Sequence, residues 1–387
     1  MTATATRAIP TDATECARLL AEATADRRTV RIKGSGTKSY IGDVGATDVE
    51  LSTERLAGVI DHVPADLTVT LGAGARMVDV AAELARAGQF LPLDPPHADE
   101  ATVGGVIAAN SNGFWRARYG GVRDLLIGTR TALADGTVAR AGGLVVKNVA
   151  GYDLDKLLVG SFGTLGVIVE ATLKVLPLPE RSDGLVARFD RPADAFAVAN
   201  AVTRAASRVE ACVVERSEDG QWRVAVRARG SDPTVKRAMS DARREVAAGH
   251  GEAVELADAL VRMRELPARA TDGALVRVSL PLAASAAFAE SAVRLESFAA
   301  VIVDAASGIV RVHLVNDDDD AVIRDAEALL LAARMVGGAG RIERRAEQLR
   351  SRLLTWPNRP NGDFLMRRIK EAFDPAGILE PGRSAFA

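Results

Sequence analysis

The chain has 387 residues, of which 48% are hydrophobic and 26% charged, and its formal net charge is -2. That length is too great for one ordinary hydrophobic core, so two or more domains are expected. The near-neutral charge excludes a basic field that would attract nucleic acid or anionic lipid. The aromatic content of 4% also argues against a platform for stacking bases.

The cysteine count limits the redox chemistry of the chain. Cys16 and Cys212 stand far apart in the sequence, and they are the two cysteines present. Two thiols exclude a disulfide framework, and they exclude an iron–sulfur cluster held by this chain alone, because such clusters usually need four thiolates. No metal site is predicted.

Residues 1–12 lack the apolar core of a signal peptide, and no apolar run approaches the roughly 20 residues of a membrane span. We therefore expect a cytoplasmic protein without direct membrane insertion. Any attachment to the inner membrane is expected to be made through partner subunits.

The predicted elements of the first half are short. Asp12 and Glu15 form a capping box for a helix that reaches about residue 24. Further helices are predicted at 77–87, 102–109 and 153–159, and strands at 29–33, 49–52, 68–71, 125–134, 137–141 and 165–176. The helix at 77–87 is expected to direct Val78, Ala81, Ala82 and Leu84 to one side.

After Glu180 the glycines become rarer, and Ala- and Arg-rich helices alternate with strands. Asp232 followed by Pro233 is typical of a helix cap and first turn. Helices are predicted at 193–206, 234–248, 282–294 and 321–335, and strands at 211–215, 222–229, 275–280, 301–304 and 309–314. This order indicates an antiparallel sheet covered by helices on one face.

Two glycine-rich segments point to a phosphorylated ligand. They are KGSGT at 33–37 and ATVGGVIAANSNG at 101–113, and GSFGTLG follows at 160–166. Main-chain N–H groups of a turn or a helix N-terminus stabilise a pyrophosphate, and glycine lets the backbone approach it. Each segment alone is compatible with simple turn chemistry, but the three together indicate a flavin dinucleotide site.

The ordered blocks KGSGT, LDPP, ATVGGVIAANSNG, GVRDLLIGTRTALADG and NVAGYDLDKLLVGSFGTLGVI resemble the PCMH-type FAD-binding domain of the vanillyl-alcohol oxidase family. The resemblance covers residues 13–179, and within the family residues 145–177 and the ending FDPAGILEPGR are most similar to FAD-binding subunits of glycolate oxidase. It implies an α+β fold with a PCMH-type FAD-binding domain of two α+β subdomains at 1–180. A cap or substrate domain at 181–350, built of an antiparallel sheet and helices, and a C-terminal segment at 351–387 that packs back toward the FAD site complete the expected fold.

The resemblance also implies which residues bind FAD. It places the pyrophosphate at 34–37 and 102–105, the ribityl chain and ring along 108–113, and the adenosine and flavin edges at 160–168. The full predicted set is Lys33, Gly34, Ser35, Gly36, Thr37, Pro95, Thr102, Val103, Gly104, Gly105, Ala108, Asn110, Ser111, Gly113, Gly160, Thr164, Gly166, Val167 and Ile168.

Two departures from the family pattern affect the expected site. Many relatives join FAD covalently to a histidine in the first glycine loop or further on, whereas this loop has Ser35 and Thr37 and no histidine. His97, which follows LDPP, is interpreted as a loop histidine, so non-covalent FAD is predicted. Related enzymes often end in DPxxxxNPG with the asparagine near the flavin. Glu380 takes that place here, which leaves open whether the tail presents a neutral polar group at the ring.

The resemblance implies oxidation of a 2-hydroxy acid with hydride transfer to the flavin, which requires a cation for the carboxylate and a base for the hydroxyl proton. Arg277, Arg311 and His313 are the predicted catalytic residues, although His313 also fits a structural role. Further candidate cations are Arg116, Arg118 and Arg123.

The implied function is that of an FAD-binding subunit of a glycolate oxidase complex, acting on glycolate or a related 2-hydroxy acid. A second FAD-containing subunit and an iron–sulfur subunit are the expected partners, and no nucleic acid is expected. Two alternatives remain open. One is a self-sufficient FAD-dependent dehydrogenase of 2-hydroxy acids or sugars, and the other is an electron-relay subunit that binds FAD without turning over a substrate.

Overall fold

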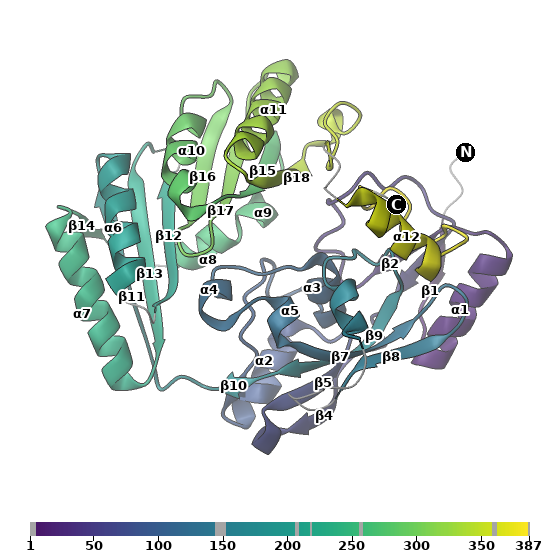
Figure 1. Cartoon of the computed structure of the whole chain (residues 1–387). Coiled ribbons are helices and arrows are strands. Elements are labelled where there is room, and N and C mark those ends of the chain that lie inside the picture. The colour runs from purple at the N-terminus through teal and green to yellow at the C-terminus, as the bar shows by residue number, and fades with distance from the viewer. Residues whose placement is uncertain are drawn as a thin grey trace. The chain divides into compact units, whose positions relative to one another are not determined.

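The computed structural model describes residues 5–143, 152–205, 209–216, 219–254, 258–357 and 362–385. They form two compact units (Figure 1). The first unit comprises residues 1–112, 120–178 and 358–387, and the second comprises residues 113–119 and 179–357. Both units combine helices with sheets, which confirms the predicted α+β class. The sequence did not indicate that the short segment 113–119 belongs to the second unit.

One layer of the first unit is a three-stranded parallel sheet with a helix. Its order is β1 (Thr6–Ala8), β3 (Val49–Ser52) and β2 (Val30–Lys33), and the helix is α1 (Ala13–Ala25). Asp12 caps α1, because its carboxylate accepts the main-chain N–H groups of Thr14 and Glu15 at 2.8 Å. Glu15 accepts hydrogen bonds from Thr11 instead of Asp12, so half of the expected capping box is displaced by one residue.

A five-stranded antiparallel sheet forms the other layer of the first unit. Its order is β4 (Val59–Val63), β5 (Thr68–Gly72), β9 (Val167–Lys174), β7 (Leu126–Ala132) and β8 (Val138–Gly142). Val167 and Val169 share a core with α1, while Ile168 faces the opposite core. That second core is built with α2 (Met77–Arg86), α3 (Val103–Ala109) and α5 (Val122–Leu125).

Four short elements belong to the first unit as well as the two sheets and their helices. They are η1 (Pro64–Asp66), β6 (Gln89–Phe90), η2 (Leu154–Leu158) and β10 (Leu176–Pro177).

The predicted apolar face of helix α2 was wrong. The helix buries Met77, Val80 and Leu84, whereas Val78 is exposed. The buried residues follow an i, i+3, i+7 spacing, and the prediction had rotated the apolar face away from Met77 and Val80.

The C-terminal residues return to the first unit, as the predicted fold requires. Helix α12 (Asp363–Phe373) is followed by a segment that pairs with β2. The N–H of Val30 donates to the carbonyl of Ile378 at 2.8 Å, and the N–H of Glu380 donates back to the carbonyl of Val30 at 2.9 Å. The buried Lys370 ammonium donates to the carbonyls of Thr164 and Leu379, both at 2.9 Å, and pairs with Asp374.

The second unit is built on an eight-stranded antiparallel sheet. Its order is β14 (Glu252–Val254), β11 (Arg181–Phe189), β13 (Trp222–Gly230), β12 (Val209–Arg216), β16 (Phe298–Asp304), β17 (Ile309–Leu314), β15 (Ala274–Ser279) and β18 (Ala339–Arg345). Every pairing between neighbours is antiparallel, as predicted.

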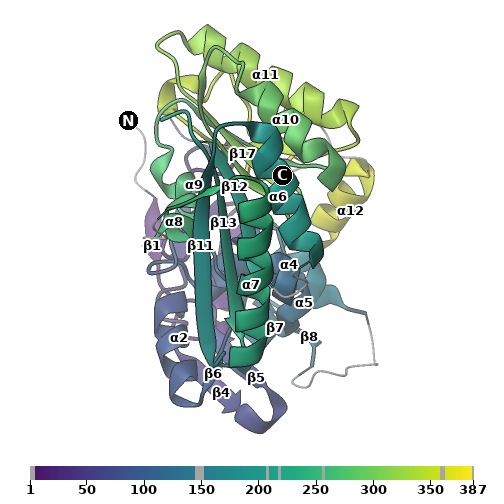
Figure 2. The ribbon, with the colours of Figure 1, turned by 90° about the vertical axis from the view of Figure 1, so that its left-hand side faces the viewer.

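Four long helices cover one face of this sheet, and Figure 2 views the sheet from the side of α6 and α7. They are α6 (Pro192–Ala205), α7 (Asp232–Ala248), α10 (Ser285–Ala292, preceded by η3, Leu282–Ala284) and α11 (Asp319–Met335). Asp232 is the first residue of α7, and Ser231 takes the cap position that was predicted for Asp232. The opposite face is covered in part by α8 (Ala259–Arg264) and α9 (Leu266–Arg269). The described part of the unit also contains α4 (Arg116–Tyr119) and η4 (Glu347–Leu349).

Candidate functional site

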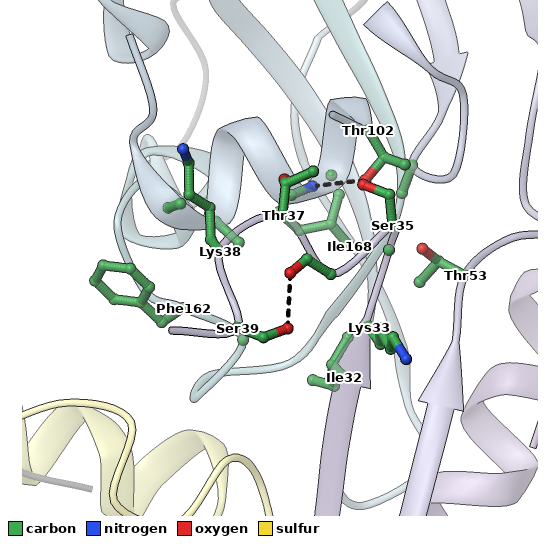
Figure 3. Close-up of a pocket in the computed structure, with 18 of the residues that line it drawn as sticks. Ile32, Lys33, Ser35, Thr37, Lys38, Ser39, Thr53, Thr102, Phe162 and Ile168 are labelled. Carbon is green, nitrogen blue, oxygen red and sulfur yellow. Dashed lines mark hydrogen bonds between the residues drawn. The ribbon is translucent and has the colours of Figure 1, made fainter. Parts of the chain in front are cut away.

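The first unit contains a pocket between the turn after β2 and the start of α3 (Figure 3). The empty space within it is about 760 Å³, a value that includes space open to solvent. Eleven of the residues predicted from the sequence line it, namely Lys33, Gly34, Ser35, Gly36, Thr37, Thr102, Gly104, Gly105, Ala108, Gly166 and Ile168. The fold therefore brings the three glycine-containing segments to one place.

Close contact between the first two segments depends on Gly34. A Cβ atom at this position would lie 2.2 Å from Oγ1 of Thr102, so any side chain here would force Thr102 or the loop to move. Ser35 and Thr102 consequently lie beside each other at the pocket wall (Figure 3). The Thr102 hydroxyl in turn accepts the N–H of Gly105 at 3.4 Å and caps α3.

The free main-chain donors are concentrated in the first loop. The N–H groups of Ser35, Gly36 and Thr37 find no acceptor among the described residues. At the start of α3, by contrast, Val103 donates to the carbonyl of Ala75 at 2.9 Å and Gly104 donates to that of Ala73 at 2.8 Å. The loop rather than the helix start is therefore the main supply of unpaired N–H groups for an anion.

The charges around the pocket favour an anionic ligand. Arg31, Lys33, Lys38 and Arg383 line it, and no acidic residue is among the described lining residues. Lys33 is partly neutralised by Glu50 at 3.3 Å, and Arg383 donates to the carbonyls of Ser39 and Ile41. A pyrophosphate would meet both unpaired N–H groups and positive side chains here.

A second group of predicted residues lies in the second unit, on the sheet face opposite the four long helices. The register of β15 and β17 pairs Arg277 with Arg311 and Leu275 with His313. The three predicted catalytic side chains therefore share one face of neighbouring strands. The Nε2–H of His313 donates to the carbonyl of Asp272 at 3.0 Å, which leaves Nδ1 as the acceptor nitrogen.

Glu343 on β18 is the charge partner that sequence reasoning missed. Its carboxylate accepts Nε of Arg311 at 2.7 Å and lies 3.6 Å from Arg341. Burial raises the pKa of Glu343, but the positive charges of Arg311, Arg341 and Arg277 outweigh burial and bring the pKa to about 2. Glu343 is therefore a permanently ionised carboxylate surrounded by guanidinium groups.

Arg277 differs from its neighbours because it makes no hydrogen bond or ion pair with any described residue. Burial lowers the pKa of Arg277 to about 9, and the positive charge of Arg341 acts in the same direction. An uncommitted guanidinium in such surroundings is suited to bind a carboxylate, whose two oxygens match its fork of donors.

Comparisons with known proteins identify the family. A family model described as an FAD binding domain matches residues 5–142. Glycolate oxidase subunit GlcE of Escherichia coli (strain K12) is 35% identical over 261 residues, which are 67% of this chain and 71% of that protein. The chain belongs to the GlcE family of FAD-binding proteins.

Other relatives share a shorter region with this GlcE-family chain. Glycolate oxidase subunit GlcD of Bacillus subtilis (strain 168) is 35% identical over 183 residues, 47% of this chain and 39% of that protein. D-lactate dehydrogenase of Archaeoglobus fulgidus is 36% identical over 170 residues, which are 43% of this chain and 38% of that protein.

Solved structures agree on the fold. Alkyldihydroxyacetonephosphate synthase has a TM-score of 0.74 at 17% identity, with 97% of this chain and 76% of that chain covered. p-Cresol methylhydroxylase has a TM-score of 0.74 at 16% identity, with 97% and 88% covered.

The pocket residues fit the FAD of this family. Unpaired N–H groups of the loop and four positive side chains suit a pyrophosphate, and Gly105 opens onto the space beside them. Sequence reasoning missed ten lining residues, which are Arg31, Ile32, Lys38, Ser39, Thr53, Ala73, Ala109, Phe162, Gly163 and Arg383. Most of them directly adjoin a predicted segment, so extending those segments by a few residues would have found them.

Eight predicted FAD residues do not line the pocket: Pro95, Val103, Asn110, Ser111, Gly113, Gly160, Thr164 and Val167. The side chains of Val103 and Val167 are buried in the two hydrophobic cores of the first unit. The Thr164 hydroxyl donates to the carbonyl of Ser161 at 2.7 Å, and Gly113 falls in the second unit. Main-chain contacts of these residues with FAD stay predictions.

Glu380, the departure from the family motif, has a structural role in the first unit. Its carboxylate accepts the N–H of Ile32 at 2.6 Å and so extends the pairing between β2 and the tail. It is buried in the left-handed region at a φ of 46°, a conformation in which asparagine is more common. Burial raises the pKa of Glu380, although the charge of Arg383 opposes this shift. Glu380 does not line the pocket.

The described residues contain no group of three or more His, Cys, Asp or Glu side chains placed to hold a metal ion. In the same part of the chain, no helix combines the length and apolar character needed to cross a bilayer.

We expect the flavin to leave the polypeptide when the holoprotein is denatured by acid or heat. No histidine is among the described residues that line the pocket, and the glycine loop carries the hydroxyl side chains Ser35 and Thr37. The measurement is absorbance of the supernatant after precipitation, together with the mass of the intact chain. Yellow colour that stays with the pellet would show a covalent bond.

Proposed function

We propose that the chain is the FAD-binding subunit of a glycolate oxidase complex and that it binds the carboxylate of a 2-hydroxy acid through Arg277. The observation that carries the second part is the guanidinium of Arg277, which pairs with no described residue and lies on the same sheet face as Arg311, which pairs with Glu343. The relatives GlcE and GlcD are glycolate oxidase subunits, which supports the first part.

When bound by the first unit, FAD would supply the hydride acceptor for oxidation of a 2-hydroxy acid. Arg277 orients the substrate by binding its carboxylate. Nδ1 of His313 accepts the hydroxyl proton, because Nε2 is held as a donor by the carbonyl of Asp272. Arg311 stays paired with Glu343 and keeps the arginine cluster in place.

Partner subunits are part of the proposal. The chain carries two cysteines, both buried, and burial raises the pKa of each thiol to about 12, so neither is a thiolate ligand for a cluster. Onward transfer of single electrons is therefore assigned to an iron–sulfur partner, and a second FAD-containing subunit is expected beside it.

The test is anaerobic titration of the FAD-loaded chain with glycolate and D-lactate, followed by flavin absorbance. We expect efficient bleaching when the partner subunits are added and little bleaching without them. Equal bleaching of the isolated chain would favour a self-sufficient dehydrogenase. A flavin that stays oxidised with and without partners would favour an electron-relay subunit and would contradict a catalytic role.

A further inference from the structure

The segment 113–119 is fixed on the sheet face that carries Arg277. Phe114 is buried in a hydrophobic cluster with Leu275 and Ile302, which lie on β15 and β16. The ring of Trp115 lies 5.5 and 5.0 Å from the guanidinium carbons of Arg227 and Arg229. Arg116, the next residue, therefore has a well-anchored backbone.

Tyr119 closes the same segment. Its hydroxyl donates to Oε1 of Glu210 at 3.2 Å, and Glu210 also binds Arg227 and Arg229 at 2.7 and 3.2 Å. Helix α4 is thereby held from both sides, by the aromatic contacts of Trp115 and by the buried carboxylate of Glu210.

The arginines of this face divide into paired and unpaired groups. Arg227 and Arg229 both pair with Glu210, Arg311 pairs with Glu343, and the Arg118 guanidinium carbon lies 5.8 Å from the ring centre of Tyr119. Arg116 is half-buried and, like Arg277, makes no hydrogen bond or ion pair with any described residue.

The two guanidinium groups belong to the same part of the sheet face, because Phe114, two residues before Arg116, packs in one cluster with Leu275, two residues before Arg277 on β15. The charge of Arg116 contributes to the lowered pKa of Arg277, after burial and the charges of Arg341 and Arg311. Glu343 is a single negative charge shared by Arg277, Arg311 and Arg341, so an anion bound between Arg116 and Arg277 would further reduce the repulsion among these positive groups.

We propose that Arg116 is a second anion-binding residue of the substrate site and that it holds, together with Arg277, the carboxylate of a short 2-hydroxy or 2-oxo acid. The proposal rests on the function proposed above and adds a specificity-determining residue to it. Because both groups keep their full donor sets for the ligand, each contributes charge-assisted hydrogen bonds to the bound anion.

The test measures binding of oxalate, used as a dicarboxylate probe, to the full chain loaded with FAD. Titration calorimetry at constant ionic strength gives the dissociation constant, with chloride as the non-specific anion. We expect Arg116→Gln and Arg277→Gln each to raise the dissociation constant about tenfold or more. The matched control Arg204→Gln removes an exposed arginine of α6 that pairs with no described residue, and it should leave the dissociation constant unchanged.

Thermal stability in anion-poor buffer separates a binding role from a structural one. Arg116→Gln should leave the Tm unchanged or raise it, because it relieves repulsion and breaks no pair among the described residues. Arg116→Lys keeps the charge without the planar fork and should bind oxalate with intermediate affinity. A lowered Tm with unchanged oxalate binding would show that Arg116 is structural and would overturn the proposal.

The outcomes also distinguish this proposal from the proposed function. If Arg277→Gln weakens binding and Arg116→Gln does not, the role of Arg116 is wrong and the carboxylate site stands. If neither variant changes the dissociation constant for oxalate, or if the wild-type chain does not bind oxalate, both the role of Arg116 and the carboxylate site at Arg277 are wrong.

Discussion

Replacing Gly105 with valine is expected to abolish retention of FAD while leaving a folded apoprotein. Gly105 is exposed and lines the pocket, and a Cβ atom there would meet only Oγ1 of Thr102, at 3.1 Å. The isopropyl group would therefore occupy space needed by the cofactor rather than force the core apart. The measurement is the ratio of flavin to protein absorbance after gel filtration, with circular dichroism to confirm folding.

The neighbouring glycine provides a matched control. A Cβ atom on Gly104 would lie 2.8 Å from Cβ of Ala73 and 3.0 Å from its carbonyl oxygen, so Gly104→Val should strain the fold and lower the Tm. Gly105→Ala should retain part of the FAD. Normal FAD content in folded Gly105→Val protein would refute the placement of the cofactor in this pocket.

Replacing Glu343 with glutamine is expected to destabilise the second unit by about 3–5 kcal/mol, the usual result of removing one partner from a buried ion pair. The amide keeps the shape of the carboxylate but leaves Arg277, Arg311 and Arg341 without their shared counter-charge. Urea unfolding followed by tryptophan fluorescence reports on this unit, because Trp115, Trp222 and Trp356 all lie in it. Glu347→Gln, at an exposed position, should change stability by less than about 0.5 kcal/mol.

The same carboxylate predicts a pH dependence. The pKa of Glu343 is lower in the folded chain than its ordinary value of 4.5, at about 2. The ionised Glu343 therefore contributes fully to the free energy of unfolding above the pKa of the unfolded chain. This contribution is lost as the pH falls toward the pKa in the folded chain. The stability difference between wild type and Glu343→Gln should shrink between about pH 7 and about pH 3. A difference that stays constant over this range would show that charge is not its cause.

Local signals were sufficient for most elements. Asp12 and Thr102 are helix caps in the structure as predicted, since a capping residue acts on N–H groups two or three positions away. The turn at Asp135 and Gly136 likewise joins β7 and β8. Long helices of the second unit, such as α11, were found from their apolar spacing.

Non-local pairing explains what sequence reasoning missed. Strand β18 has one large apolar residue, Ile342, which lies between Arg341 and Glu343, so neither alternation nor composition marks it as a sheet strand. Its pairing with β15 is what places Glu343 near Arg311 and Arg277. The glycine segments of the pocket could be predicted, because each of them is continuous in the sequence. The contact between Gly34 and Thr102 could not be predicted, because these residues are distant in the sequence and only the fold brings them together.

The pairing of β2 with residues near Glu380 has a consequence for biosynthesis. Ile32 and Glu380 are 348 residues apart, and translation at about 5–20 residues per second separates their emergence from the ribosome by roughly 20 to 70 s. During that interval the flavin-binding unit lacks its last strand-like segment and the Lys370 contacts to Thr164, while residues 179–357 have already been made. The later-encoded unit can therefore complete its fold first, and loading of the cofactor becomes a post-translational event.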